Sequence, residues 1–167
     1  MMKVFGIAGW KNSGKTGLVE RLVAHFTAQG LRVSTVKHTH HRVDLDRPGK
    51  DSFRHRDAGA REVLIVSENR WALLHELRDT PEPSLAQLLA KLSPVDLVLV
   101  EGYKSGPHPR IEAHRKATAQ PYLAATDETI LAIAADDPKG CTLDKPLFDL
   151  DDTAAIAAFI RQTVGIS

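Results

Sequence analysis

The fold is decided by residues 6–26, which read "GIAGWKNSGKTGLVERLVAHF". Within them, residues 9–16 match the pattern G-x-x-x-x-G-K-[ST] at every fixed position. The apolar run before this loop, Val4–Ala8, predicts a buried parallel strand, and apolar residues at three- and four-residue spacing after it predict a helix. A glycine-rich loop between a strand and a helix turns its main-chain N–H groups toward phosphate oxygens. We therefore predict a cradle for nucleotide phosphates.

Every residue of this loop is predicted to contact the nucleotide. The residues are Gly9, Trp10, Lys11, Asn12, Ser13, Gly14, Lys15 and Thr16. We expect the Lys15 ammonium to bridge the outer phosphates, which is a catalytic role, and the Thr16 hydroxyl to ligate Mg²⁺. Gly17 stands where such loops often continue with a helix former, so the first helical turn is weakened while the phosphate contacts remain.

A second part of the nucleotide site is predicted at the end of the segment Asp96–Gly102, "DLVLVEG". Magnesium among phosphate oxygens takes further oxygen ligands. Glu101 closes the predicted strand at the edge where open α/β sheets bind ligands, so we expect it to hold the metal or its water and to act in catalysis. An ordinary strand-end glutamate is the alternative. Asp96 opens the strand far from that edge and is predicted to be a surface or capping residue.

The rest of the chain alternates predicted strands and helices. Strands are expected at residues 31–36, 63–66, 71–74, 95–100 and 130–135, and helices after Ser84, where Gln87 completes a capping box, and at residues 156–164. Residues 63–74 read as a hairpin turning at Glu68-Asn69, and residues 107–115 as an exposed hairpin or surface loop. We predict an α/β, P-loop NTPase-type three-layer fold with a mostly parallel sheet, helices on both faces and a possible hairpin extension. Residues 1–167 are expected to form a single nucleotide-binding domain.

Composition excludes several classes of protein. The formal net charge of +1 gives the whole molecule no attraction to nucleic acid or to an anionic membrane. Cys141 is the only cysteine, so an internal disulfide is impossible and a reducing cytoplasm fits. No apolar run is long enough to span a bilayer. We expect a cytoplasmic protein.

Residues 37–61, "KHTHHRVDLDRPGKDSFRHRDAGAR", form an unusual segment, with seven lysine and arginine residues, four aspartates and four histidines. It could close over bound phosphates or a second anionic substrate, or be a solvated loop and a charged helix face. Asp51 could cap a short helix through Ala58, or reach the outer magnesium shell opposite Glu101 and act in catalysis. His38, His40 and His41 raise the possibility of a metal site, although no cysteine joins them.

A carboxylate after one of the predicted strands is the candidate that would recognise the base. Asp136 follows the predicted strand 130–135 at its ligand-facing end, where a carboxylate can accept the N1–H and N2 amino protons of guanine. The alternative is a turn aspartate, because Asp137 and Pro138 follow it. We also expect slow hydrolysis, since no glutamine is positioned to orient water.

Three motifs together resemble the molybdopterin-guanine dinucleotide biosynthesis protein B family (MobB). They are "GWKNSGKT" (residues 9–16), "VKHTHHRVDLDRPGKDSFRHRDAGA" (36–60) and "LVLVEGYK" (97–104). The resemblance spans Val4 to about Arg115. It implies a homodimeric P-loop protein that binds Mg²⁺ and GTP, with weak GTPase activity, and assists guanylylation of the molybdenum cofactor. Asp51 and Glu101 would lie near the magnesium.

The resemblance also implies partners. These are the molybdopterin cofactor or its precursor and the guanylyltransferase, protein A of the same pathway, which performs nucleotide transfer itself. Two alternatives from other classes remain open. One is a small-molecule kinase in which residues 37–61 bind the acceptor, and the other is a metal-insertion GTPase that uses His38, His40 and His41.

Overall fold

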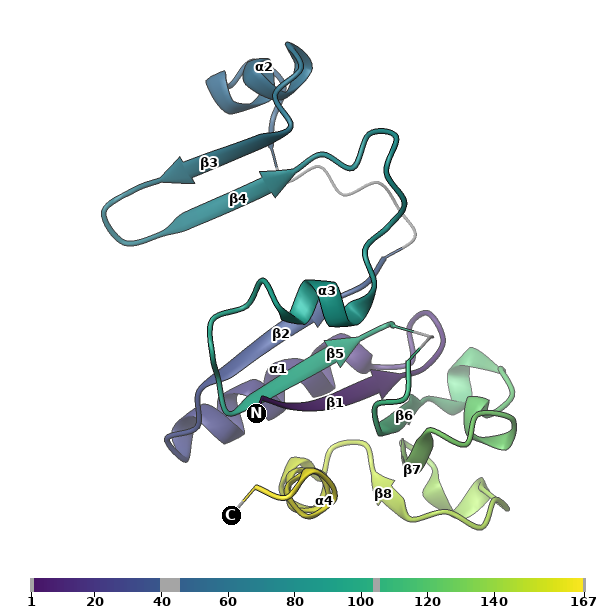
Figure 1. Ribbon diagram of the computed structural model, residues 1–167. Coiled ribbons are helices and arrows are strands. Elements are labelled where there is room, and N and C mark those ends of the chain that lie inside the picture. Colours follow the sequence, from purple (N-terminus) through teal and green to yellow (C-terminus); the bar gives the residue numbers. More distant parts are fainter. Residues whose placement is uncertain (1, 40–45, 104–105, 167) are drawn as a thin grey trace. The chain divides into compact units, whose positions relative to one another are not determined.

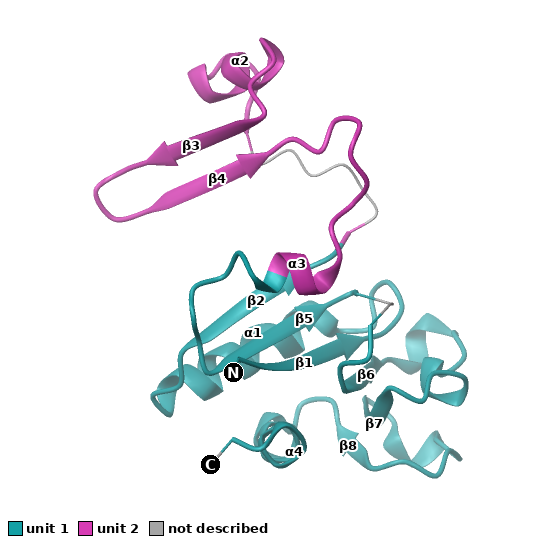
Figure 2. Cartoon of the chain, viewed as in Figure 1, with its two compact units in different colours: residues 1–38, 89–167 teal, residues 39–88 magenta. Residues whose placement is uncertain are grey.

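The structure, a computed structural model, describes residues 2–39, 46–103 and 106–166. Its contacts divide the chain into two compact units, one formed by residues 1–38 and 89–167 and the other by residues 39–88 (Figure 2). A division by contacts does not test the expectation of one domain over residues 1–167, which stays a prediction. Within the described residues, no helix has the length and apolar character needed to cross a membrane.

The larger unit is built on a six-stranded sheet in the order β2-β5-β1-β6-β7-β8, in which all neighbouring strands are parallel. The strands are β1 (Lys3–Ala8), β2 (Val33–Lys37), β5 (Leu97–Glu101), β6 (Arg110–His114), β7 (Ile130–Ala135) and β8 (Leu147–Asp149). Strand β5 lies between β1 and β2, and β1, the strand before the glycine loop, lies inside the sheet with its carboxyl end beside that of β5 (Figure 1). The α/β class and the parallel sheet are confirmed.

Helices α1 (Lys15–Ala28) and α4 (Thr153–Val164) pack on one face of this sheet. Their apolar faces meet Phe5 and Ile7 of β1 in the main core, where Leu22 and Ile160 are fully buried. Over β6 and β7 the opposite face carries a smaller core with Ile133 and the 3₁₀ turn η2 (Leu123–Ala125). Burying the apolar face of each helix against the central strands is the main stabilising contribution in such layers.

The expectation that residues 107–115 form an exposed hairpin or surface loop is wrong. Residues 110–114 are β6, a fully buried strand between β1 and β7. The charged side chains of Arg110 and Glu112 are tolerated inside because each has a partner. Arg110 Nη1 lies 2.9 Å from Asp127 Oδ2, and the Glu112 carboxylate accepts hydrogen bonds from the amides of Leu123 (3.0 Å) and Ala124 (2.8 Å). Strand β8 was not predicted from the sequence either.

Asp96, predicted to be a surface or capping residue, lies just before β5 at the edge away from the glycine loop. Its carboxylate accepts hydrogen bonds from the Arg32 amide (2.8 Å) and from Arg32 Nη2 (2.8 Å). The hydrogen bond from the Arg32 side chain is the main reason that the pKa of Asp96 falls to about 2. The residue therefore fixes the start of β5, as predicted.

The smaller unit contains α2 (Asp51–Asp57) and the antiparallel hairpin of β3 (Glu62–Val66) and β4 (Trp71–His75). Val66 pairs with Trp71, so the turn occupies residues 67–70 and the predicted hairpin is confirmed. The division of the chain into units falls within helix α3 (Leu85–Leu89), between Leu88 and Leu89. Its predicted capping box is present, because Ser84 N donates to Gln87 Oε1 at 2.8 Å and Gln87 N donates to Ser84 Oγ at 3.3 Å.

Candidate functional site

The glycine loop joins the carboxyl end of β1 to the amino end of α1, and its conformation depends on glycine at two positions. Gly9 has φ +144° and Gly14, the residue before the helix, has φ +94°. A Cβ on Gly9 would lie 2.4 Å from the Ala113 carbonyl oxygen and 2.5 Å from Ser13 Oγ, closer than any real contact. Asn12 adopts φ +64°, an uncommon value for a residue with a side chain. The loop is therefore held in a tight and specific curve.

Two side chains within the loop have the chemistry of a phosphate site. Lys15 Nζ donates a hydrogen bond to the Trp10 carbonyl oxygen at 2.6 Å, so its side chain folds back along the loop that it follows. The Ser13 side chain is buried, and its Oγ has no hydrogen-bond partner among the residues that the structure describes. An ammonium and a buried hydroxyl beside main-chain N–H groups at the start of a helix suit an anion.

The structure brings together two of the predicted magnesium ligands, Thr16 and Glu101, which are 85 positions apart in the chain. Thr16 Oγ1 donates a hydrogen bond to Glu101 Oε1 at 2.9 Å, and the glutamate is buried at the end of β5. Lys37 Nζ, at the end of β2, lies 3.3 Å from the same carboxylate oxygen and 3.4 Å from Thr16 Oγ1. Two oxygen ligands at one point fit a magnesium ion. The sequence had placed Lys37 only in a basic segment.

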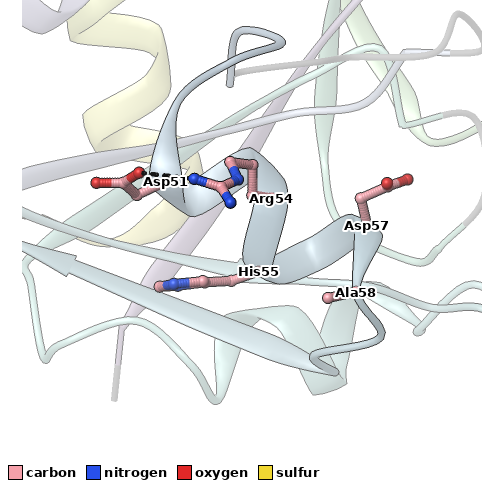
Figure 3. A pocket seen from close by; sticks show the side chains of 5 residues that line it. All are labelled: Asp51, Arg54, His55, Asp57 and Ala58. Carbon is pink, nitrogen blue, oxygen red and sulfur yellow. Dashed lines mark ion pairs between the residues drawn. The ribbon is translucent and has the colours of Figure 1, made fainter.

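Asp51, the third predicted ligand, lies in the smaller unit. It is the first residue of α2, where its exposed carboxylate lies 3.9 Å from Arg54 Nη1 and suits the positive end of the helix. The helix ends at Asp57, close to the predicted end, although Lys50 is the residue that precedes its first turn. A cavity of about 430 Å³ lies along this helix, lined by Asp51, Arg54, His55, Asp57 and Ala58 (Figure 3). The magnesium and catalytic roles of Asp51 stay predictions.

Of the three histidines of the predicted metal site, His38 lies beside the end of β5, next to Tyr103. The ring of His38 lies 4.8 Å, between centroids, from that of Tyr103, and His38 N donates to the Glu101 carbonyl oxygen at 2.9 Å. His40 and His41 lie outside the described residues. In the part of the chain that is described, no group of three or more His, Cys, Asp or Glu side chains is arranged to hold a metal ion.

Asp136, the predicted guanine reader, lies directly after β7 and contacts the segment that follows β6. Its Oδ1 accepts a hydrogen bond from the Lys116 amide at 2.9 Å. The Lys116 ammonium lies 2.8 Å from Asp137 Oδ2, and this hydrogen bond is the main cause that lowers the pKa of Asp137 and raises that of Lys116. The two aspartates therefore hold residues 115–118 against the end of the sheet, while guanine recognition by Asp136 stays a prediction.

Sequence reasoning missed a cavity of about 490 Å³ beside the glycine loop. It is lined by Trp10, Lys11, Asn12, Arg115, Ala117, Thr118 and Gln120. One wall is the glycine loop, and the other is formed by residues 115–120, which follow β6, the strand that the sequence did not predict. The proximity of that strand to the loop has no local signal, because it arises from the pairing of Ala8 with Glu112.

The wall after β6 is held by aromatic contacts as well as by hydrogen bonds. The rings of His114 and Tyr122 stack with their centroids 4.1 Å apart, and Trp10 Nε1 donates to the Pro121 carbonyl oxygen at 2.8 Å. Burial, followed by the neighbouring Cys141, raises the pKa of Tyr122 to about 12. The phenol, which is neutral at physiological pH even with its ordinary pKa, therefore stays neutral in more alkaline solution as well.

Comparison with known proteins gives a consistent result. Residues 4–136 match the family model described as molybdopterin guanine dinucleotide synthesis protein B. The molybdopterin-guanine dinucleotide biosynthesis adapter protein of Haemophilus influenzae is 40% identical over 161 residues, which are 95% of this chain and 87% of that protein. The protein of the same name from Escherichia coli is 37% identical over 163 residues, 96% of this chain and 92% of that protein.

Solved structures agree with the sequence comparison. The crystal structure of a MobB protein homolog from Bacillus stearothermophilus has a TM-score of 0.72 and 29% identity, covering 99% of this chain and all of that one. A crystal structure of molybdopterin-guanine biosynthesis protein B has a TM-score of 0.75 and 26% identity, with 96% and 99% of the two chains covered. The predicted P-loop NTPase-type fold is confirmed by these likenesses.

Proposed function

Because this chain belongs to the molybdopterin guanine dinucleotide synthesis protein B (MobB) family, we propose that it is an adapter of molybdopterin-guanine dinucleotide biosynthesis that binds GTP with Mg²⁺. The relatives that match nearly the whole chain are adapter proteins of molybdopterin-guanine dinucleotide biosynthesis. GTP is the nucleotide that supplies a guanylyl group, so an adapter with a phosphate loop has a chemical reason to bind it. We further propose a cytoplasmic location, where the cysteine stays reduced.

The observation that carries this proposal is the convergence of the glycine loop, Thr16 and Glu101 at one edge of the sheet. The loop amides and the Lys15 ammonium would hold the phosphate oxygens, with Lys15 moving from the Trp10 carbonyl to the ligand. Thr16 and Glu101 would hold Mg²⁺ or its water. When bound, Mg²⁺ neutralises charge on the outer phosphates. Each of these groups comes from the larger unit.

We propose that hydrolysis by the isolated protein is slow. Among the described residues, the Lys37 ammonium contacts both Thr16 and Glu101; it donates hydrogen bonds and cannot accept a proton from water while it is charged. Fast hydrolysis needs a group that orients the attacking water. The role of the protein is therefore to present a nucleotide rather than to consume it. Turnover by the guanylyltransferase, protein A of the pathway, is the expected reaction.

The test of nucleotide binding is Lys15→Ala, measured by isothermal titration with GTP and Mg²⁺. We expect a loss of at least about 100-fold in affinity, because a charge-assisted contact to phosphate is removed from a water-poor site. Lys91→Ala removes an exposed lysine from the same unit and should leave the affinity unchanged. Unchanged GTP affinity in Lys15→Ala, with a circular dichroism spectrum like that of the wild type, would contradict the assignment. A parallel titration with ATP tests the choice of guanine.

The adapter role has its own test. Adding the wild-type protein to the guanylyltransferase, molybdopterin cofactor and GTP should increase formation of the dinucleotide cofactor. Lys15→Ala should give a smaller increase, since the presented nucleotide is absent. An equal increase with both proteins would show that the adapter role does not depend on GTP binding.

A further inference from the structure

The phosphate site does not use the cavity between the glycine loop and residues 115–120. The cavity and the phosphate site nevertheless share residues of the loop. Trp10, Lys11 and Asn12 line the cavity and belong to the loop that would curve around the phosphates. We propose that this cavity is the nucleoside subsite, in which a purine base and its ribose lie while the attached phosphates occupy the loop. The proposal rests on the proposed function, because it extends the same nucleotide beyond its phosphates.

The size and position of the cavity support this assignment. A volume of about 490 Å³ lies within the usual range of small-molecule pockets, roughly 300 to 1,000 Å³. Arg115 lies against the loop, since a Cβ on Gly14 would be 3.1 Å from Arg115 Nε. A ligand that leaves the phosphate cradle on this side therefore enters the cavity directly. All lining residues belong to the larger unit.

The lining side chains offer the chemistry that a purine nucleoside requires. The indole of Trp10 and the guanidinium of Arg115 are planar groups on which a base can stack. The Gln120 carboxamide carries both a donor and an acceptor for a base edge. Thr118 Oγ1 donates to the Arg115 carbonyl oxygen at 2.8 Å and keeps its acceptor capacity for a ribose hydroxyl or a base. The cavity thus combines flat apolar surface with a few polar groups.

The cavity is also held in shape before any ligand arrives. Trp10 is tied to the opposite wall by its hydrogen bond to the Pro121 carbonyl oxygen. That wall is fixed at one end by Asp136, which accepts the Lys116 amide, and at the other by buried Glu112, which accepts two amides of the η2 turn. A site that is ordered in advance loses less free energy on binding. In this arrangement Asp136 is a positioning residue for the wall.

The first test uses the fluorescence of Trp10 itself. The chain has two tryptophans, and Trp71→Phe removes the other, which lies in the hairpin of the smaller unit. GTP should change the emission of Trp10 in this variant because the base stacks beside the indole. Inorganic tripolyphosphate, which carries the phosphates alone, should cause a much smaller change. Equal changes with both ligands, or no change while titration calorimetry detects GTP binding, would overturn the proposal.

The second test blocks the cavity. Ala117→Phe should lower GTP affinity by about tenfold or more, which corresponds to the loss of one stacking contact, and leave tripolyphosphate affinity unchanged. Gln120→Ala should act in the same direction with a smaller loss. Ala158→Phe places the same ring on an exposed position of α4 and should change neither affinity. GTP affinity that is unaltered in Ala117→Phe would overturn the nucleoside subsite.

The two proposals fail in different ways. Wild-type protein that binds neither tripolyphosphate nor GTP would refute the phosphate cradle and, with it, the nucleoside subsite. Wild-type protein that binds both ligands with equal affinity would leave the cradle standing and refute the subsite, because the base and ribose would then contribute nothing.

Discussion

Gly9 and Gly17 should respond in opposite ways to the same substitution. Gly9→Ala would drive a Cβ to within 2.4 Å of the Ala113 carbonyl oxygen at φ +144°, so the loop must deform. Gly17 lies in the first turn of α1 without a positive φ, and its Cβ would meet only Arg21 Nη1, at 3.6 Å. Alanine there should stabilise the helix by roughly 0.5–1 kcal/mol, whereas Gly9→Ala should destabilise the protein by at least about 1 kcal/mol.

Urea unfolding of both glycine variants measures these free energies. GTP titration measures the nucleotide affinity, which depends on the conformation of the loop. We expect Gly9→Ala to lose nucleotide binding and Gly17→Ala to retain it. A Gly9→Ala protein with wild-type stability would show that the loop has more room than the structure allows.

Lys37 should compete with magnesium for the same carboxylate. Its ammonium lies 3.3 Å from Glu101 Oε1, and a metal bound by Thr16 and Glu101 brings a second positive charge to that point. Lys37→Met removes the competing charge and keeps much of the side-chain volume. The Mg²⁺ concentration that half-saturates GTP binding should therefore fall several-fold, measured by titration at fixed GTP concentration.

The matched control is Lys139→Met, an exposed lysine of the same unit, which should leave the magnesium requirement unchanged. A requirement that rises in Lys37→Met would mean that this ammonium contacts the phosphates and assists the nucleotide rather than opposing the metal.

Among the elements, β1, the glycine loop, α1, β5 and the β3–β4 hairpin were predictable because their signals are local. Apolar runs, helical spacing and turn residues each act within a few positions of the chain. Strand β6 was not predictable in this way. Arg110 and Glu112 read as surface residues, and what permits their burial is distant in sequence, namely Asp127 and the amides of η2.

In the candidate site, too, the parts with local sequence signals were predictable and the part without them was not. The phosphate loop follows from its motif, and the meeting of Thr16 with Glu101 follows from the rule that parallel strands bring their carboxyl ends to one edge. The cavity beyond Trp10 depends on the order of the strands, which no single segment encodes. Predicting it would have required the pairing of β1 with β6.

His108, which precedes β6, makes the stability of this region depend on pH. Its ring is buried beside Arg110, and a Cβ on Gly6 would lie 2.9 Å from it. Burial, and then the charge of Arg110, lowers the pKa of His108 from 6.5 to about 4. Between these values the unfolded chain binds a proton and the folded chain does not, so stability falls as the pH drops from about 6.5 to about 4, and levels off below.

The expected loss across this window is at most about 3.4 kcal/mol, since the shift is about 2.5 pKa units and one unit corresponds to about 1.36 kcal/mol. Urea unfolding at several pH values between 7 and 4 measures it. His108→Gln should flatten the pH dependence, while His25→Gln, on the partly exposed side of α1, should preserve it. The same slope in His108→Gln and wild type would assign the effect to other groups.

At the scale of the whole protein, the hairpin of the smaller unit carries an exposed apolar face. Leu64 pairs with Leu73 and Val66 with Trp71, so these four side chains share one face of the two strands. Their exposed fractions run from 45% for Leu73 to 68% for Val66. A two-stranded sheet is marginally stable in water without cover, and an apolar face of this kind marks an interaction site.

A second copy of the chain is the occupant that we predict for this face, in agreement with the homodimer that the family resemblance implies. A net charge of +1 gives two copies little reason to repel each other. The protein should therefore sediment with twice the mass of one chain at micromolar concentration.

Leu64→Lys with Val66→Lys should yield monomers, because two ammonium groups would be buried at the contact. Leu147→Lys, at a 37% exposed position on β8, should leave the dimer intact. A wild-type monomer at these concentrations would assign the apolar face to a different protein, and the guanylyltransferase could then be tested on it by adding it to wild type and to the double variant.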